Sequence, residues 1–157
     1  WFRIAHDGNS AAIIDAVAGI IGNIPKTIVT NFFQALGWTR YNFGQIAAGY
    51  FVKKEALSNS VAIATGYIAD YVLAMLLGIM IVYIFRLMGK DYAVFKGLLF
   101  GGVTYVFIYG IAMVLDFTRV SLLTPLPNLV LFVPHVVFGG TAAWIIKRYG
   151  SLEQQIS

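Results

Sequence analysis

The sequence has little charge. Only 11% of its 157 residues are charged, whereas 59% are hydrophobic, and an ordinary soluble domain carries about a quarter charged residues. A soluble fold of this length would expose large apolar patches and aggregate. The composition therefore indicates an integral membrane protein that has the lipid bilayer as its main partner. The length allows one domain, residues 1–157, with no room for a separate soluble one.

The sequence also lacks cysteine, which excludes disulfides, iron–sulfur clusters and thiolate metal sites. It has only two histidines, so neither a multi-histidine metal site nor another cofactor is expected. GxSxG, HExxH and phosphate-binding glycine motifs are absent as well. We therefore expect no catalytic residue and no enzyme. The net charge of +4 comes from Lys and Arg scattered near segment ends, a pattern typical of membrane proteins and not of nucleic-acid binding.

Four segments reach the roughly 20 mostly apolar residues that a spanning helix needs. They cover about residues 11–37, 58–88, 92–115 and 128–146. We therefore expect an all-α fold, an integral membrane bundle of four transmembrane helices. The chain starts at Trp1 rather than Met, so we expect upstream residues to be missing or removed. The first apolar segment is too long for a signal peptide, and we expect it to be retained as a helix.

The three connections differ in composition. Residues 38–57 mix aromatic and basic side chains, which suits the headgroup region, so we expect a short interfacial helix there, with a re-entrant loop as the alternative. Residues 89–91 form a very short connection, which predicts an antiparallel hairpin of the middle helices. Residues 117–127 contain Pro125 and Pro127 and are expected to form a stiff extended cap.

The basic residues that flank the spans favour one orientation. Six fall on the side of the termini and four on the other, which by the positive-inside rule places both termini in the cytoplasm. The first group is Arg3, Arg86, Lys90, Lys96, Lys147 and Arg148, and the second is Arg40, Lys53, Lys54 and Arg119.

Glycines mark the expected helix contacts. Gly97 and Gly101 form a GxxxG pattern in the third span, and Gly139 and Gly140 leave the last span without side chains at two successive positions. Such residues let helix backbones approach closely in lipid. We expect Gly97, Gly101 and Gly139 to pack within the bundle, and self-association through the same face is the alternative.

Ionisable side chains within spans are informative because each costs roughly 2.5–3.5 kcal/mol at mid-helix. Lys26, Asp70 and His135 each lie a few residues to the same side of the midplane, and a rise of about 1.5 Å per residue gives them similar depths. We predict a buried cluster of these three residues, with Lys26–Asp70 as the ion pair. Asp15 shares the polar stripe of Lys26 and is expected nearer the other surface, where it can be hydrated.

Three stretches carry a family resemblance: AGIIGNIPKTIV at residues 18–29, KGLLFG at residues 96–101, and His135 ahead of Gly139 and Gly140. They resemble small four-helix membrane proteins of clostridia-like bacteria, the hypothetical proteins of the YqhR and YagU type. The resemblance implies a location in the bacterial cytoplasmic membrane. It implies no reaction, substrate or catalytic residue.

The function expected from the sequence is a non-enzymatic structural or accessory membrane subunit, as a homo-oligomer or in a larger membrane complex. The alternative is a small channel or transporter that moves protons, ions or a small solute through the Lys26, Asp70 and His135 cluster. Such a pathway needs polar residues that continue to both surfaces, whereas a structural ion pair is sealed by aliphatic neighbours. A snorkelling Lys26 without a partner is a further interpretation. A membrane enzyme acting on lipid would need a polar cleft near Arg40 or Arg119.

Overall fold

The computed structural model describes residues 8–120 and 124–150, and for residues 8–12 and 14 it describes the backbone alone. The described residues form helices and no strand, so the all-α prediction is confirmed. In chain order the elements are α1 (Gly8–Ala35), α2 (Phe43–Ala48), the 3-10 turn η1 (Lys54–Ala56), α3 (Ser60–Met88), α4 (Ala93–Thr104), the π-helix η2 (Tyr105–Gly110), α5 (Ile111–Val114) and α6 (Pro125–Tyr149).

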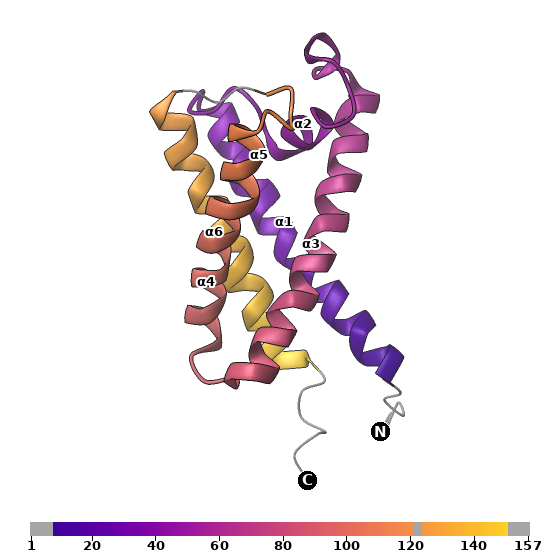
Figure 1. Ribbon diagram of the computed structural model, residues 1–157, viewed down its shortest axis with the longest axis vertical. Helices are drawn as coiled ribbons and strands as arrows, with labels where there is room; N and C mark the ends of the chain where they lie inside the picture. Colours follow the sequence, from indigo (N-terminus) through magenta and orange to yellow (C-terminus); the bar gives the residue numbers. More distant parts are fainter. Residues whose placement is uncertain (1–7, 121–123, 151–157) are drawn as a thin grey trace.

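The long helices pack in an order that differs from the chain order (Figure 1). α4 packs along α6, α6 along α1, and α1 along α3. α3 and α4 are joined by a short turn in which Gly89 and Tyr92 have positive φ angles of 74° and 54°. Away from that turn the two helices diverge and make few contacts. The short turn therefore joins two antiparallel helices, as predicted, but it is not followed by packing of these helices against each other.

α6 begins three residues before the segment expected from the sequence. Thr124 is its N-cap, and Pro125 stands in the first turn. Proline fits this place because the first N–H groups of a helix have no intrahelical partner. The prediction of an extended cap up to Pro127 is thus wrong, since the two prolines start a helix instead of ending a loop.

A short helix, α2, lies within the connection where one was expected. It begins with a capping box in which the Asn42 side chain accepts from the Gln45 N–H and the Gln45 side chain accepts from the Asn42 N–H. α2 packs against α3 so closely that a Cβ on Gly66 would overlap the carbonyl of Gly44. Phe43 is 5% exposed. α2 is therefore part of the packed structure and not a loose connection.

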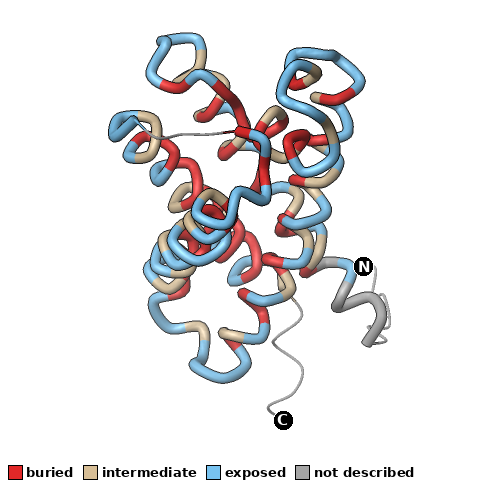
Figure 2. The backbone as a smooth tube through the Cα atoms, turned by 45° about the horizontal axis from the view of Figure 1, so that its top comes forward, coloured by how far each residue is buried: buried red, intermediate tan, exposed pale blue. Residues whose placement is uncertain are grey.

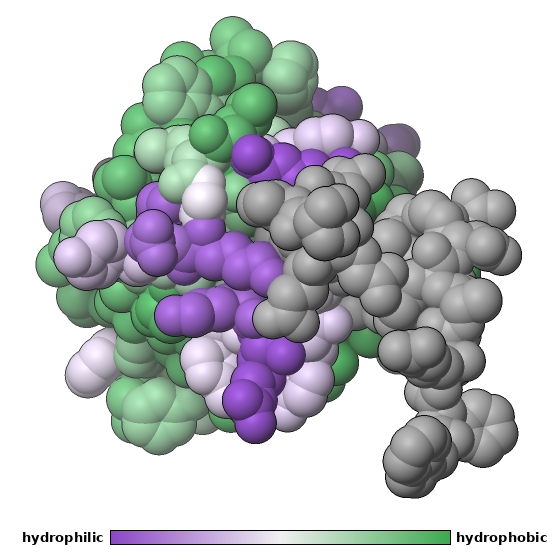
Figure 3. All heavy atoms as spheres, turned by 90° about the horizontal axis from the view of Figure 1, so that it is seen from below, coloured by the Kyte–Doolittle hydropathy of each residue, from purple (hydrophilic) through white to green (hydrophobic). Residues whose placement is uncertain are grey.

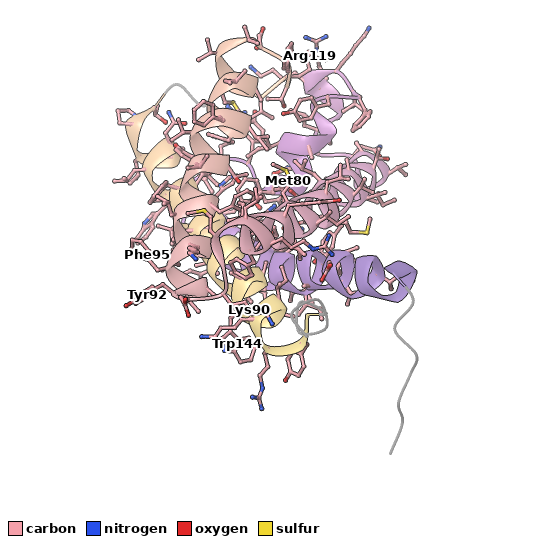
Figure 4. All side chains as sticks on the ribbon, turned by 60° about the horizontal axis from the view of Figure 1, so that its bottom comes forward. Met80, Lys90, Tyr92, Phe95, Arg119 and Trp144 are labelled. Carbon is pink, nitrogen blue, oxygen red and sulfur yellow. The ribbon has the colours of Figure 1, made fainter. Side chains whose placement is uncertain are left out.

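Apolar side chains cover the flanks of the bundle. Three helices of the described chain are long and apolar enough to cross a membrane, Ser60–Met88, Ala93–Val114 and Pro125–Tyr149. The start of α1, the end of α6 and the α3–α4 turn lie at one end (Figure 1), where hydrophilic side chains gather with hydrophobic ones around them (Figure 3). Lys90 lies at this end and Arg119 at the opposite one (Figure 4). These features are those of a membrane protein.

Buried residues follow the inner faces of the helices and exposed residues the outer faces (Figure 2). Glycines make the closest contacts. A Cβ on Gly101 would overlap the carbonyl of His135, and one on Gly97 would overlap that of Gly139. A Cβ on Gly139 would in turn overlap the Gly97 carbonyl. The three glycines singled out in the sequence therefore lie between α4 and α6 of the same chain, and their face is occupied within the bundle.

Candidate functional site

An ion pair joins α1 to α3 inside the bundle. Lys26 Nζ donates to Asp70 Oδ1 over 2.5 Å, and each side chain is 8% exposed. Asn23, one turn before Lys26, donates from Nδ2 to Asp70 Oδ2 over 2.8 Å. One carboxylate oxygen of Asp70 therefore accepts from an ammonium and the other from an amide. A buried charge needs hydrogen bonds of this kind.

Aromatic rings surround the Lys26 ammonium. Nζ lies 4.5 Å from the ring centroid of Phe43 in α2 and 6.0 Å from that of Phe138 in α6. Such cation–π contacts are stronger where water is excluded. Since an ammonium has three N–H donors and only one points to Asp70, donor capacity remains for the ring face and for a further acceptor.

Polar amides hold α2 in this position. Asn42 Nδ2 donates to Asn31 Oδ1 over 3.1 Å and to Gln34 Oε1 over 3.0 Å. Gln34 Nε2 donates to Gln45 Oε1 over 2.8 Å, and the Tyr67 hydroxyl of α3 donates to Asn31 Oδ1 over 3.2 Å. The network connects α1, α2 and α3, and it thereby fixes the α2 aromatic ring against the ammonium.

His135 of α6 faces the same interior. Its Nδ1 lies 2.8 Å from the carbonyl of Leu131, one turn earlier. Because a carbonyl only accepts, Nδ1 carries the proton, and Nε2 of the neutral ring is an acceptor. The ring packs edge-on against Phe43, with centroids 4.9 Å apart. In the described structure no hydrogen bond joins His135 to Lys26 or Asp70, so the third predicted member lies beside the pair without bonding to it.

A cavity of about 240 Å³ lies against the pair. This volume far exceeds the roughly 10–15 Å³ that one water needs and approaches the roughly 300 Å³ of small drug-binding pockets. Apolar side chains make up most of its wall. Its polar lining consists of Asn23, Lys26, Asp70, Thr104, Tyr109 and His135.

The mouth of the cavity is on the flank of the bundle. Four of its lining residues are markedly exposed: Leu73 of α3 (37%), Ile108 of η2 (38%), and Tyr50 (46%) and Phe51 (62%) just after α2. The opening therefore lies between α3 and η2, which continues α4 on the side where it has diverged from α3. Its rim is apolar and aromatic, whereas its floor is polar.

The π-helix η2 forms one wall. Tyr109 lines the cavity and stacks on Tyr105, with ring centroids 5.0 Å apart. The Tyr105 hydroxyl donates to the Asn128 carbonyl over 2.6 Å and ties η2 to α6. Single π-helical turns occur frequently at functional sites because they shift the face on which side chains project.

Close backbone contacts separate the cavity from the end at which α1 begins. A Cβ on Gly19 would overlap the Ala74 carbonyl, and one on Gly22 would lie 2.8 Å from the Cβ of Ala142. A Cβ on Gly78 would lie 2.8 Å from the Gly19 nitrogen. Within the described residues, α1 therefore meets α3 and α6 directly beyond the floor, and the cavity is open on one side.

Asp15 lies apart from the other predicted residues. It stands two turns before Asn23 on α1, is 3% exposed, and its Oδ1 has no hydrogen-bond partner among the described residues. The structure places it toward the end of the bundle that the sequence indicated, but its side chain is buried and not open to solvent. It does not line the cavity.

Several residues of the site carry no signal in the sequence. Asn23 does carry a signal, because it lies beside the polar stripe of Lys26 one turn away. Phe43 and Tyr109 look like ordinary membrane aromatics, and only their placement by α2 and η2 makes them part of the site. Within residues 8–120 and 124–150, no three His, Asp, Glu or Cys side chains lie close enough to hold a metal ion.

The floor thus offers hydrogen-bond donors and acceptors, and the walls offer apolar contact, a combination suited to binding. No protein-family model, curated protein or solved structure matches this chain.

Proposed function

We propose that this chain is a four-span integral membrane protein that binds a small amphipathic molecule beside Lys26 and Asp70, as a non-enzymatic binding or accessory subunit. One observation carries the proposal: the ion pair forms the floor of a cavity that opens on the apolar flank. A pair that only fixed helix register would be enclosed by aliphatic side chains. The open side gives a ligand access to groups that are otherwise costly to keep in a membrane.

α1 is the fourth span in this proposal. Its 28 residues give a length of about 42 Å, more than the roughly 30 Å of the hydrocarbon core. Its polar side chains Asn23 and Lys26 are buried, whereas Ile13, Ile24 and Ile28 are exposed, as expected for a helix with lipid on one side. α2 then lies near the headgroups.

The one-sided cavity favours binding over conduction. A channel or transporter would need an open path from the cavity past Gly19 and Gly22 toward Asp15, and there α1 is in close contact with α3 and α6. The structure thus supports the binding role better than the alternative of a proton, ion or solute pathway.

The proposal includes a location and an assembly. The chain resides in a bacterial cytoplasmic membrane, with the end that carries Lys90, Lys147 and Arg148 in the cytoplasm according to the positive-inside rule. It works as a homo-oligomer or within a larger membrane complex. Because the Gly97, Gly101 and Gly139 face is used inside the bundle, contacts between subunits would use other apolar faces.

Stabilisation by lipid tests the binding role. A molecule that binds only the folded protein raises its stability by about 2.7 kcal/mol at a hundred times its dissociation constant. Delipidated protein should therefore gain thermal stability from a lipid extract of its native membrane, relative to synthetic phosphatidylcholine alone. Ala69→Phe, which fills the cavity, should abolish the gain, whereas Ala64→Phe on the exposed face of α3 should keep it. An equal gain in all three proteins would refute the binding role.

A further inference from the structure

The charge on the cavity floor restricts the ligand. Lys26 and Asp70 neutralise each other at 2.5 Å, and the Asn23 amide and the His135 ring add no net charge. An anionic headgroup would compete with Asp70 for the ammonium, and a cationic one would compete with Lys26 for the carboxylate. Either would leave a buried charge without its partner, which is costly in an apolar surrounding. The floor therefore suits a neutral group.

The floor also has unused hydrogen-bonding capacity of both kinds. Since the carboxylate of Asp70 only accepts, the Asn23 nitrogen faces it and the Asn23 oxygen points elsewhere. Asn23 is 0% exposed, so its Oδ1, which has no partner among the described residues, is enclosed by the protein and does not face the cavity space. The acceptor on the floor is Nε2 of His135, and Lys26 keeps N–H donors. A hydroxyl both donates and accepts, so it can use both kinds of group at once.

The position of the floor points to the bilayer as the source. Asp70 lies four residues, or about 6 Å, from the middle residue of α3. The mouth opens past Leu73 and Ile108 on the apolar flank. An alkyl chain can leave through this mouth into the hydrocarbon, whereas a charged phospholipid headgroup would have to leave the interface to reach the floor.

Resting on the proposed binding function, we infer that the ligand is a neutral membrane lipid with a hydroxyl headgroup, of the kind represented by long-chain alcohols and monoacylglycerols. The hydroxyl contacts Lys26 and His135, and the chain passes between α3 and η2. The volume of about 240 Å³ holds the headgroup and the first carbons, and the rest of the chain stays in lipid.

Competition among lipids of equal chain length tests the ligand class. A monoacylglycerol that carries a diazirine near its headgroup is photolysed with the protein in nanodiscs, and the labelled residues are mapped by mass spectrometry. Labelling should fall on cavity residues and be lost in Ala69→Phe but not in Ala64→Phe. Monolauroylglycerol should compete at concentrations about tenfold lower than methyl laurate, which cannot donate, because one ordinary hydrogen bond has about that effect. Lauric acid and dodecyltrimethylammonium should compete as weakly as methyl laurate, and so should free glycerol, which lacks a chain.

The outcomes separate the two proposals. Equal competition by all four dodecyl compounds would overturn the hydroxyl class while leaving a binding cavity. Competition by glycerol alone would overturn the lipid source. Absence of labelling above the Ala69→Phe background would overturn the binding function itself. His135→Phe, which removes the acceptor on the floor, should remove most of the preference for monolauroylglycerol, whereas Thr27→Val, which removes a buried hydroxyl outside the cavity, should not. If His135→Phe does not fold, the competition of the four twelve-carbon compounds for the wild-type protein still tests the ligand class.

Discussion

The ion pair between α1 and α3 allows a quantitative prediction. Lys26→Met removes the charge that faces Asp70 at 2.5 Å, and Asp70→Leu removes its partner. Breaking a buried pair typically costs about 3–5 kcal/mol because the remaining charge is stranded, whereas replacing both partners by apolar groups is often neutral or stabilising. The cavity beside the pair has room for water molecules that can solvate the remaining charge, so we expect each single change to cost about 3 kcal/mol, at the lower end of that range.

A double-mutant cycle measures this coupling. The free energy of unfolding of the wild type, the two single variants and the combined variant is measured by denaturation in mixed micelles. The combined variant should lose no more stability than one single variant, so the coupling should be at least about 3 kcal/mol. Lys54→Met with Asp91→Leu, exposed residues in the η1 turn and the α3–α4 turn, is the matched control and should be additive within about 0.5 kcal/mol. Additive losses for Lys26 and Asp70 would show that the pair does not stabilise the fold.

Three further predictions concern packing, pH and topology. Gly101→Ala should lower the thermal stability because the new Cβ meets a backbone carbonyl of α6, whereas Gly102→Ala, which meets only a phenylalanine ring at 3.4 Å, should be tolerated; equal effects would place the close helix contact elsewhere. Partial burial at the cavity mouth raises the pKa of Tyr50, which is half-exposed, so its small contribution to stability is present below pH 10 and lost as the pH rises further; Tyr50→Phe should reduce this alkaline loss, and an unchanged pH profile would contradict the partial burial. Single cysteines at Lys90 and Arg119 in this cysteine-free chain should be labelled from opposite sides of the membrane, and labelling from one side would contradict the bundle orientation.

The features that follow from helical periodicity could be predicted from the sequence. Asn23 and Lys26 lie one turn apart, and a depth estimate alone placed Lys26 level with Asp70. This estimate works because a helix has a fixed rise per residue and a buried ionisable group is costly without a partner. The GxxxG spacing of Gly97 and Gly101 likewise predicted a close contact between helices.

The shape of the cavity could not be predicted. It depends on the divergence of α3 and α4, on the insertion of α2, and on the π-helix at Tyr105–Gly110, none of which follows from the hydrophobic pattern. α3 and α4 diverge because α1 and α6 pack between them. The short turn at Gly89 gives no sign of this arrangement. The prediction at Pro125 was wrong because proline is common both in extended segments and in the first turn of a helix, and here it begins α6.

The proposed function requires the wild-type cavity to hold a small molecule. Native mass spectrometry of the protein released from mild detergent measures this most directly, because a bound molecule adds its mass to that of the chain. We predict a discrete added mass on the wild type and on Ala64→Phe, and none on Ala69→Phe, whose new ring occupies the cavity. The same added mass on Ala69→Phe would contradict the account, and so would its absence from the wild type.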